Sequence, residues 1–152
     1  MSRSDFAAFI LTHGRAGRVT TERALRKHGY TGDVVYLIDD EDDQGDEYRR
    51  LYGTVRTFSK QEYVDRCDTM CPSSDIRRGV ILYARNAAID AARDMGYRYL
   101  IELDDDYNRF EHRYVVGKTA KTVPIDDLDT VFDAMVEFLD RAGASTVAMA
   151  QG

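Results

Sequence analysis

Three adjacent aspartates, Asp104, Asp105 and Asp106, come directly after an apolar, β-prone segment at residues 97–103. Two unit charges about 4 Å apart repel by roughly 4 kcal/mol at an effective dielectric of ~20. A hard cation, a ring of Lys and Arg, or exposure to water would offset this repulsion. Magnesium and manganese commonly bind one or two carboxylates together with water and substrate phosphates. Alternate side chains of an extended chain point the same way, so we expect Asp104 and Asp106 to bind one Mn2+ or Mg2+ ion while Asp105 points elsewhere.

A glycine-containing loop is the second candidate for chemistry. Residues 6–12 are mostly apolar, and the sequence His-Gly-Arg-Ala-Gly-Arg follows at residues 13–18. A loop that joins a strand to a helix can hold a phosphate through backbone amides. The loop matches neither the G-x-G-x-x-G pattern nor the Gly-Lys-Ser/Thr ending of a P-loop. Two interpretations stay open: contact with a phosphate or nucleotide, or a turn whose arginines are solvated.

An acidic stretch follows the second apolar segment, because seven of the nine residues from 39 to 47 are Asp or Glu. A calcium-binding helix-loop-helix does not fit, since with Gly45 in the sixth position the twelfth is Leu51 instead of a glutamate. We interpret the later acids as a solvated loop: Asp42, Asp43, Asp46 and Glu47. Asp39 and Asp40 end a predicted strand, where a carboxylate can accept hydrogen bonds from a base or a ribose.

Arg85 and Asn86 lie near the start of an alanine-rich segment with helical spacing. The planar guanidinium of an arginine can bind a diphosphate with two hydrogen bonds, and an asparagine amide can bind the polar edge of a ring. The alternative is that both side chains are solvated on the surface.

The elements that position these residues alternate between strands and helices. We expect strands at residues 6–12, 34–38, 54–58 and 99–103, and helices at residues 20–27, 46–52, 59–68, 80–95 and 128–142. Residues 110–116 also look extended. This alternation predicts an α/β fold with a mainly parallel sheet flanked by helices. In such sheets ligands bind beyond the carboxyl ends of the strands, near a switch in strand order, where the four candidate segments should meet.

Composition limits the class of protein. The 152 residues are 43% hydrophobic, enough for one domain with a real core, and the net charge of −6 argues against a general binder of polyanions. No apolar run approaches the roughly 20 residues of a membrane span, and no signal peptide is evident, so we expect a cytoplasmic protein. We also expect a strand at residues 145–150, which suggests that a single domain at residues 1–152 is the front part of a longer protein.

Four motifs in order resemble the nucleotide-sugar-binding half of GT-A fold glycosyltransferases: Phe9-Ile10-Leu11-Thr12-x-Gly14-Arg15, Asp39-Asp40, Ala84-Arg85-Asn86 and Leu103-Asp104-Asp105-Asp106. Within that fold, the chain is most similar to the phage-type group called TET-associated glycosyltransferases. These enzymes are thought to add sugars to hydroxymethylated pyrimidines in DNA. The likeness spans about residues 6–150.

The resemblance implies a metal-dependent, hexosyltransferase-type enzyme that uses a nucleoside diphosphate sugar, with UDP-sugar favoured. It assigns Thr12, Gly14 and Arg15 to the nucleotide, and Asp39 or Asp40 to its base. Arg85 and Asn86 would contact the base or the diphosphate. Asp104 and Asp105 would contact the nucleotide sugar, and Asp104 and Asp106 the ribose and the metal. An acceptor hydroxyl then attacks the anomeric carbon. In this superfamily the acceptor site and the catalytic base usually follow the strand at which this chain ends. The base, the sugar, the acceptor and retention or inversion therefore stay open.

Two other functions compete with this interpretation. A nucleotidyltransferase also uses an α/β sheet and acidic metal ligands, but its usual glycine-rich, lysine-bearing loop is missing. A non-catalytic nucleotide-sugar-binding module is the other alternative. Titration of nucleoside diphosphate sugars with manganese, followed by a test for released diphosphate, separates the three functions.

Overall fold

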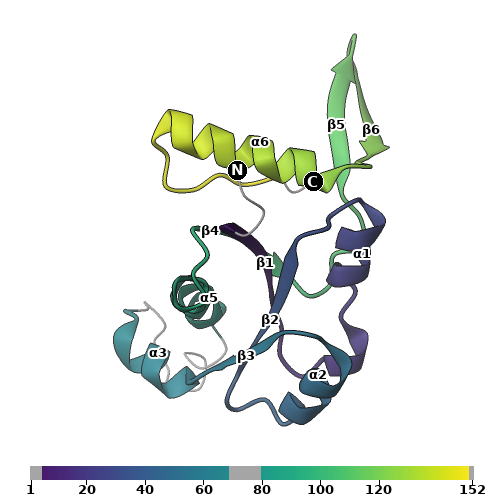
Figure 1. The fold of residues 1–152 in the computed structure, drawn as a ribbon. Coiled ribbons are helices and arrows are strands. Elements are labelled where there is room, and N and C mark those ends of the chain that lie inside the picture. The colour runs from purple at the N-terminus through teal and green to yellow at the C-terminus, as the bar shows by residue number, and fades with distance from the viewer. Residues whose placement is uncertain (1–4, 69–79, 151–152) are drawn as a thin grey trace.

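The protein is described by a computed structural model that covers residues 5–68 and 80–150. Its centre is a four-stranded parallel sheet in the order β3-β2-β1-β4 (Figure 1). The strands are β1 (Phe6–Leu11), β2 (Asp33–Asp39), β3 (Val55–Phe58) and β4 (Tyr99–Asp104). The predicted α/β fold with a parallel sheet is therefore confirmed.

The strand order creates a switch point between β1 and β4. From β1 the chain proceeds to β2 and β3 on one side, and β4 then pairs with the other side of β1. In the registers of these pairs, Leu11 at the end of β1 lies opposite both Leu37 and Asp104. The residues that follow β1 and β4 consequently lie next to each other at the switch point, where parallel sheets bind ligands.

Within residues 5–68 and 80–150, five α-helices pack around the sheet: α1 (Thr21–Lys27), α2 (Gly45–Leu51), α3 (Lys60–Arg66), α5 (Leu82–Asp94) and α6 (Leu128–Ala142), with a short 3-10 helix η2 (Ala16–Arg18) before α1. Helices α3 and α5 lie on one face, and α1 and α6 lie toward the other (Figure 1). No helix in the described residues is long and apolar enough to cross a membrane.

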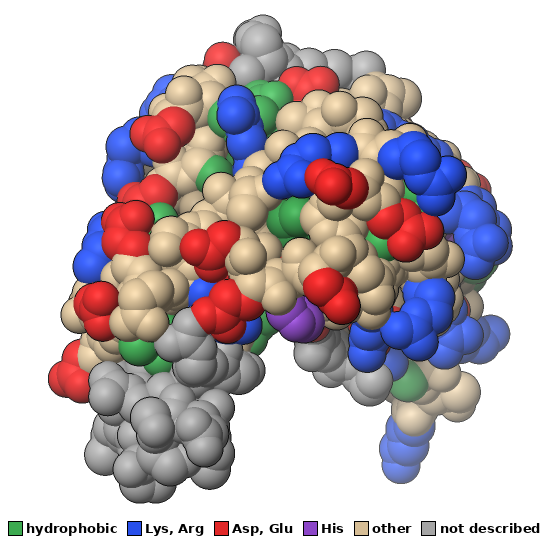
Figure 2. Space-filling model, turned by 90° about the horizontal axis from the view of Figure 1, so that it is seen from below, with side chains coloured by type: hydrophobic (Ala, Val, Ile, Leu, Met, Phe, Trp, Pro, Cys, Tyr) green, Lys and Arg blue, Asp and Glu red, His purple; other side chains and the backbone are tan. Residues whose placement is uncertain are grey.

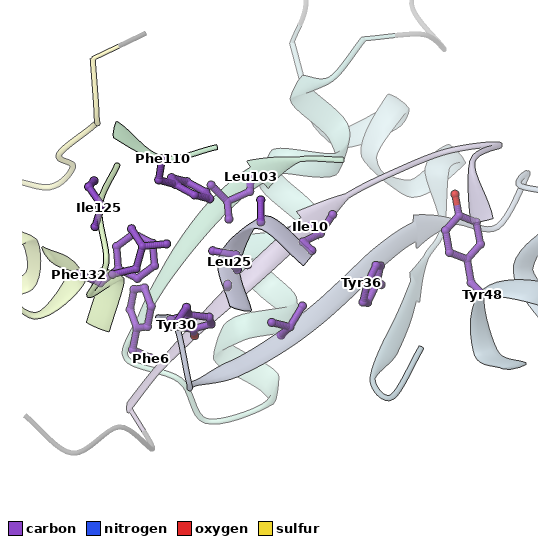
Figure 3. Packing of buried hydrophobic residues seen from close by; sticks show 14 of the residues in the cluster. Phe6, Ile10, Leu25, Tyr30, Tyr36, Tyr48, Leu103, Phe110, Ile125 and Phe132 are labelled. Carbon is purple, nitrogen blue, oxygen red and sulfur yellow. The ribbon is translucent and has the colours of Figure 1, made fainter. Parts of the chain in front are cut away.

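Both faces of β1 are buried, which explains why this segment is apolar without alternation. Phe6, Ala8 and Ile10 pack into one cluster with α1 and α6, whereas Ala7 and Phe9 pack on the opposite face. In the first cluster the rings of Phe6 and Phe132 lie 5.5 Å apart, and Tyr30 packs against both (Figure 3). Such aromatic pairs contribute about 0.5–1.5 kcal/mol each beyond their buried area.

The alanine-rich helix α5 packs on the second face, as the sequence indicates. Ala87, Ala88 and Ala92 are buried there against β1 and β2. Their small side chains let the helix backbone approach the sheet closely. This packing fixes the first turns of α5, which carry Arg85, near the carboxyl end of β4.

A two-stranded antiparallel hairpin lies outside the sheet and projects from the body of the molecule (Figure 1). It consists of β5 (Glu111–Val116) and β6 (Thr119–Pro124), and every residue from 111 to 124 is exposed. At the base of the hairpin, the buried His28 ring contacts Phe110, which precedes β5, and Ile125, which follows β6. Its Nδ1 lies 2.6 Å from the Ile125 carbonyl, and the Phe110 N–H donates to Nε2 at 3.4 Å.

The expected strand at residues 145–150 is wrong, because these residues form neither a strand nor a helix. β-propensity depends on packing against a neighbouring strand, and this segment pairs with none of the described strands. Met149 instead packs against the first cluster. The preceding helix ends as predicted, with Gly143 in the left-handed conformation at φ 64°.

Candidate functional site

A buried carboxylate joins the two strands at the switch point. Asp105 is only 8% exposed and accepts hydrogen bonds from Thr12 Oγ1 at 2.7 Å and from Arg15 Nη1 at 2.9 Å. A buried carboxylate is stable only when it is paired in this way. Asp105 therefore fastens the turn after β4 to the loop after β1.

Tyr48 extends this network from α2. Because the Thr12 hydroxyl gives its hydrogen to Asp105, its oxygen accepts the hydrogen of the Tyr48 hydroxyl at 2.8 Å. The backbone N–H of Arg15 in turn donates to the Tyr48 oxygen at 2.9 Å. Burial raises the pKa of Tyr48, which keeps the phenol protonated as a donor. The Thr12 hydroxyl is thus buried and fully used within the protein.

Asp104 and Asp106 differ from Asp105 because their carboxylates reach solvent. Their side chains are 48% and 73% exposed, and their closest cations are Arg85 at 3.8 Å and Arg15 at 4.0 Å, respectively. Strand β4 ends at Asp104, and a turn follows at Asp105 and Asp106. The extended geometry that would point Asp104 and Asp106 the same way therefore ends at Asp104, two residues before Asp106. Asp105, which the sequence expects to point elsewhere than Asp104 and Asp106, is buried.

The exposed pair fits the donor set of a hard cation. Mg2+ and Mn2+ bind proteins through one or two carboxylates and take the other ligands from water and phosphate. Asp104 and Asp106 supply that number of carboxylates, and their long ion-pair distances leave the oxygens available. Across the described ranges 5–68 and 80–150, no cluster of three or more His, Cys, Asp or Glu side chains has metal-binding geometry. A metal here would need further ligands from substrate and water.

Arg85 projects from α5 toward the same edge. Its guanidinium lies between two carboxylates of β4, with Nη1 3.6 Å from Glu102 and Nη2 3.8 Å from Asp104. Burial raises the pKa of Glu102, and Arg85 opposes that rise. The neighbouring Asn86 donates its amide to the Leu82 carbonyl at 2.8 Å, within the helix itself. Arg85 is thus held at the site by weak pairs that a phosphate could replace.

The carboxyl end of β2 carries a second buried carboxylate, Asp39. Its Oδ2 lies 2.8 Å from Nδ1 of His13, and its Oδ1 accepts from Lys60 Nζ at 3.4 Å and from the Glu41 N–H at 3.1 Å. Asp40 is exposed and accepts the Lys60 backbone N–H at 2.9 Å. Both aspartates lie at the edge where the sequence places them, but only Asp40 faces solvent.

Asp42 orders the glycine loop, which corrects its interpretation as a solvated residue. Its side chain is fully buried and accepts the Gly14 N–H at 2.8 Å and the Gln44 N–H at 2.9 Å. Gly14 has a φ of 64°, a conformation that favours glycine. Gln44 also accepts the Ala16 N–H at 2.9 Å. Within the acidic stretch, Asp42 and Gln44 therefore hold the loop after β1 in place.

Several residues at this edge were not identified from the sequence: His13, Asp42, Tyr48, Lys60 and Glu102. They come from the loops after β1 and β2, from α2, from α3 and from β4. Figure 2 shows one side of the molecule, on which acidic and basic side chains surround a histidine. The only sequence signal for His13 is its place between Thr12 and Gly14. The roles of Thr12, Gly14, Arg15, Asp39, Asp40, Arg85, Asn86 and Asp104 to Asp106 toward a ligand stay predictions.

Residues 6–152 match the family model described as TET-Associated Glycosyltransferase. No curated protein and no solved structure gives a significant match.

Proposed function

Because the chain belongs to the TET-associated glycosyltransferase family, we propose that it transfers a sugar from a nucleoside diphosphate sugar to the hydroxymethyl group of a modified pyrimidine in DNA. UDP-sugar is the favoured donor. The observation that carries the proposal is the meeting of Arg15, Arg85, Asp104 and Asp106 at the switch point of a parallel sheet. This edge is where such sheets bind nucleotides.

The two arginines supply the positive charge that a diphosphate needs. Arg15 is half-exposed beside Asp105 and Asp106, and Arg85 is half-exposed beside Asp104. Planar guanidinium groups bind phosphate oxygens with two parallel hydrogen bonds. A diphosphate placed between the two side chains would replace their loose pairs with Asp104 and Asp106 by closer bonds, and it would leave those carboxylates free.

A divalent cation fits the carboxylates that are released. Asp104 and Asp106 would hold it, and it would offset the negative charge that develops on the departing diphosphate. Asp105 has another task, because its oxygens already hold Thr12 and Arg15. It fastens the loop after β1 to the turn after β4, beside the place we propose for the nucleotide.

The transfer itself exchanges one bond for another. The acceptor hydroxyl oxygen forms a bond to the anomeric carbon while the bond from that carbon to the diphosphate oxygen breaks, and the electron pair leaves with the diphosphate. The acceptor proton passes to a base that we do not assign. DNA as the acceptor rests on the family, whose members are associated with TET systems.

Release of UDP tests the proposal. The protein is incubated with a UDP-hexose, manganese, and duplex DNA that contains either 5-hydroxymethylcytosine or cytosine. We expect UDP release and a mass increase of the DNA by one hexose only with the modified base. Tight UDP binding without transfer would favour a non-catalytic binding module, and release of pyrophosphate from a nucleoside triphosphate would favour a nucleotidyltransferase.

A further inference from the structure

Asp39 is closed to a ligand by its own protein partners. Its side chain is only 7% exposed, and both carboxylate oxygens are occupied, one by His13 and the other by Lys60 and the Glu41 N–H. A nucleobase could reach this carboxylate only by displacing His13. The geometry therefore argues against direct contact between Asp39 and a base.

His13 presents the opposite arrangement. Its side chain is 55% exposed although its Nδ1 lies 2.8 Å from the buried Asp39. Since a carboxylate accepts, Nδ1 carries the hydrogen, and the ring is fixed with its Nε2 side free. Nε2 has no hydrogen-bond partner among residues 5–68 and 80–150. A polar atom is thus held in a set direction at the edge of the donor site.

The groups around His13 hold it in place. Asp42 Oδ2 lies 3.8 Å from Nδ1 and also accepts the N–H of Gly14, the next residue of the loop. Lys60 is mostly buried and lies 3.4 Å from Asp39 and 3.7 Å from Glu41, so it offsets part of the negative charge behind the ring. A histidine that is supported from behind and free in front is suited to contact a ligand.

We infer that His13 contacts the nucleoside of the sugar donor, and that Asp39 acts on the nucleoside only through His13, as a positioning residue. This inference rests on the proposed donor. The nucleoside is the part concerned because His13 faces β2, whereas Arg85, Asp104 and Asp106 gather on the β4 side of β1. The diphosphate and the metal belong to that second group of residues.

Two amide substitutions of His13 separate ligand contact from structural support. In His13→Gln the terminal amide lies near the place of Nε2, and its oxygen can accept there as Nε2 does; in His13→Asn the amide nitrogen lies near Nδ1 and can donate to Asp39. By calorimetry with UDP and manganese, we expect His13→Ala and His13→Asn to weaken binding about ten-fold, whereas His13→Gln recovers a large part of the affinity. Recovery by asparagine and not by glutamine would overturn the inference, because the bond to Asp39 alone would then matter.

A double-mutant cycle tests whether Asp39 acts through His13. Asp39→Asn in the parent should weaken UDP binding about ten-fold, since the ring loses its charged support. In the His13→Ala background the same substitution should change the affinity less than two-fold. Equal effects in both backgrounds would show direct contact between Asp39 and the nucleoside and would overturn the inference.

Controls separate this inference from the donor proposal. His112 is exposed on the hairpin away from the site, so His112→Gln should bind UDP like the parent. Affinity for manganese pyrophosphate should be unchanged in His13→Ala, and an equal loss for pyrophosphate and UDP would overturn the nucleoside assignment. If the parent binds no UDP, the proposed donor fails and this inference fails with it. If the parent binds UDP and His13→Ala binds it equally well, only this inference fails.

Discussion

Replacement of the buried Asp105 by alanine should lower the free energy of unfolding, whereas replacement of the exposed Asp106 should leave it nearly unchanged. Asp105→Ala removes the acceptor of the buried Thr12 hydroxyl and the partner of Arg15. A hydrogen bond to a charged group contributes about 1.5–3 kcal/mol, and in this variant the buried Thr12 hydroxyl still accepts from Tyr48 but has no acceptor for its own hydrogen. The Arg15 side chain is half-exposed, so solvent screens its contribution and reduces it below ~1 kcal/mol.

The expected loss in the free energy of unfolding is therefore about 2–3 kcal/mol. For a domain of this size, a loss of about 2 kcal/mol lowers the melting temperature by roughly 4–8 °C. Urea unfolding followed by circular dichroism gives the free energy, and calorimetry gives the melting temperature. Asp105→Asn should cost less than the alanine variant, because the amide oxygen still accepts from Thr12 while the charge toward Arg15 is lost.

Asp106→Ala is the matched control. Its side chain is 73% exposed and its nearest cation, Arg15, lies at 4.0 Å, so its removal should leave the unfolding free energy within about 0.5 kcal/mol of the parent. Equal stability of Asp105→Ala and the parent would show that Asp105 does not fasten β4 to the loop after β1. The network at the switch point would then need another explanation.

Three further predictions concern the same molecule. UDP affinity measured by calorimetry should fall strongly when manganese is replaced by a chelator. Asp104→Ala and Asp106→Ala should each remove most of this dependence on manganese. Equal affinity of the parent protein with manganese and with chelator would refute the metal assignment. Arg85→Lys should weaken binding of a UDP-sugar nearly as much as Arg85→Ala, because lysine keeps the charge and loses the planar fork; parent-like binding would make Arg85 a general point charge. Burial and the bond to Asp90 raise the pKa of Tyr63 from 10.0 to about 12, so its stabilising effect is complete below pH 10 and is lost between pH 10 and 12; in alkaline titrations of unfolding, Tyr63→Phe should lose less stability over that window.

Local sequence patterns were sufficient to predict most of the strands of the sheet and the helices around it. The apolar run of β1 predicts a strand buried on both faces, and glycines mark the ends of α1 and α6, where Gly29 and Gly143 have positive φ. The second strand of the hairpin was missed because Thr119–Pro124 is fully exposed and mixes polar and apolar residues without regular alternation. An exposed strand carries none of the alternation between apolar and polar residues that identifies a half-buried one.

The support of the site was not predictable, because it depends on pairs that are distant in sequence. Asp42 and Gly14 are separated by 28 residues, and Thr12 and Asp105 by 93. A carboxylate in an acidic stretch looks the same in sequence whether it is solvated or buried under a loop. The strand ends themselves were predictable, since parallel strands bring their carboxyl ends to one edge. That is why the sequence predicted the edge at which the candidate residues meet but not the bonds between them.

The projecting hairpin offers a place to add a reporter to this protein. No side chain between residues 111 and 124 belongs to the core, and His28 holds the base of the hairpin from within the body of the fold. Exposed loop tips tolerate insertions because no buried backbone is disturbed. A fluorescent tag or an affinity peptide inserted after Gly117, which forms the turn at φ 63°, would lengthen the arm without touching the strands that carry the aspartates. Surface immobilisation through this arm would hold the molecule by an element that lies outside the sheet.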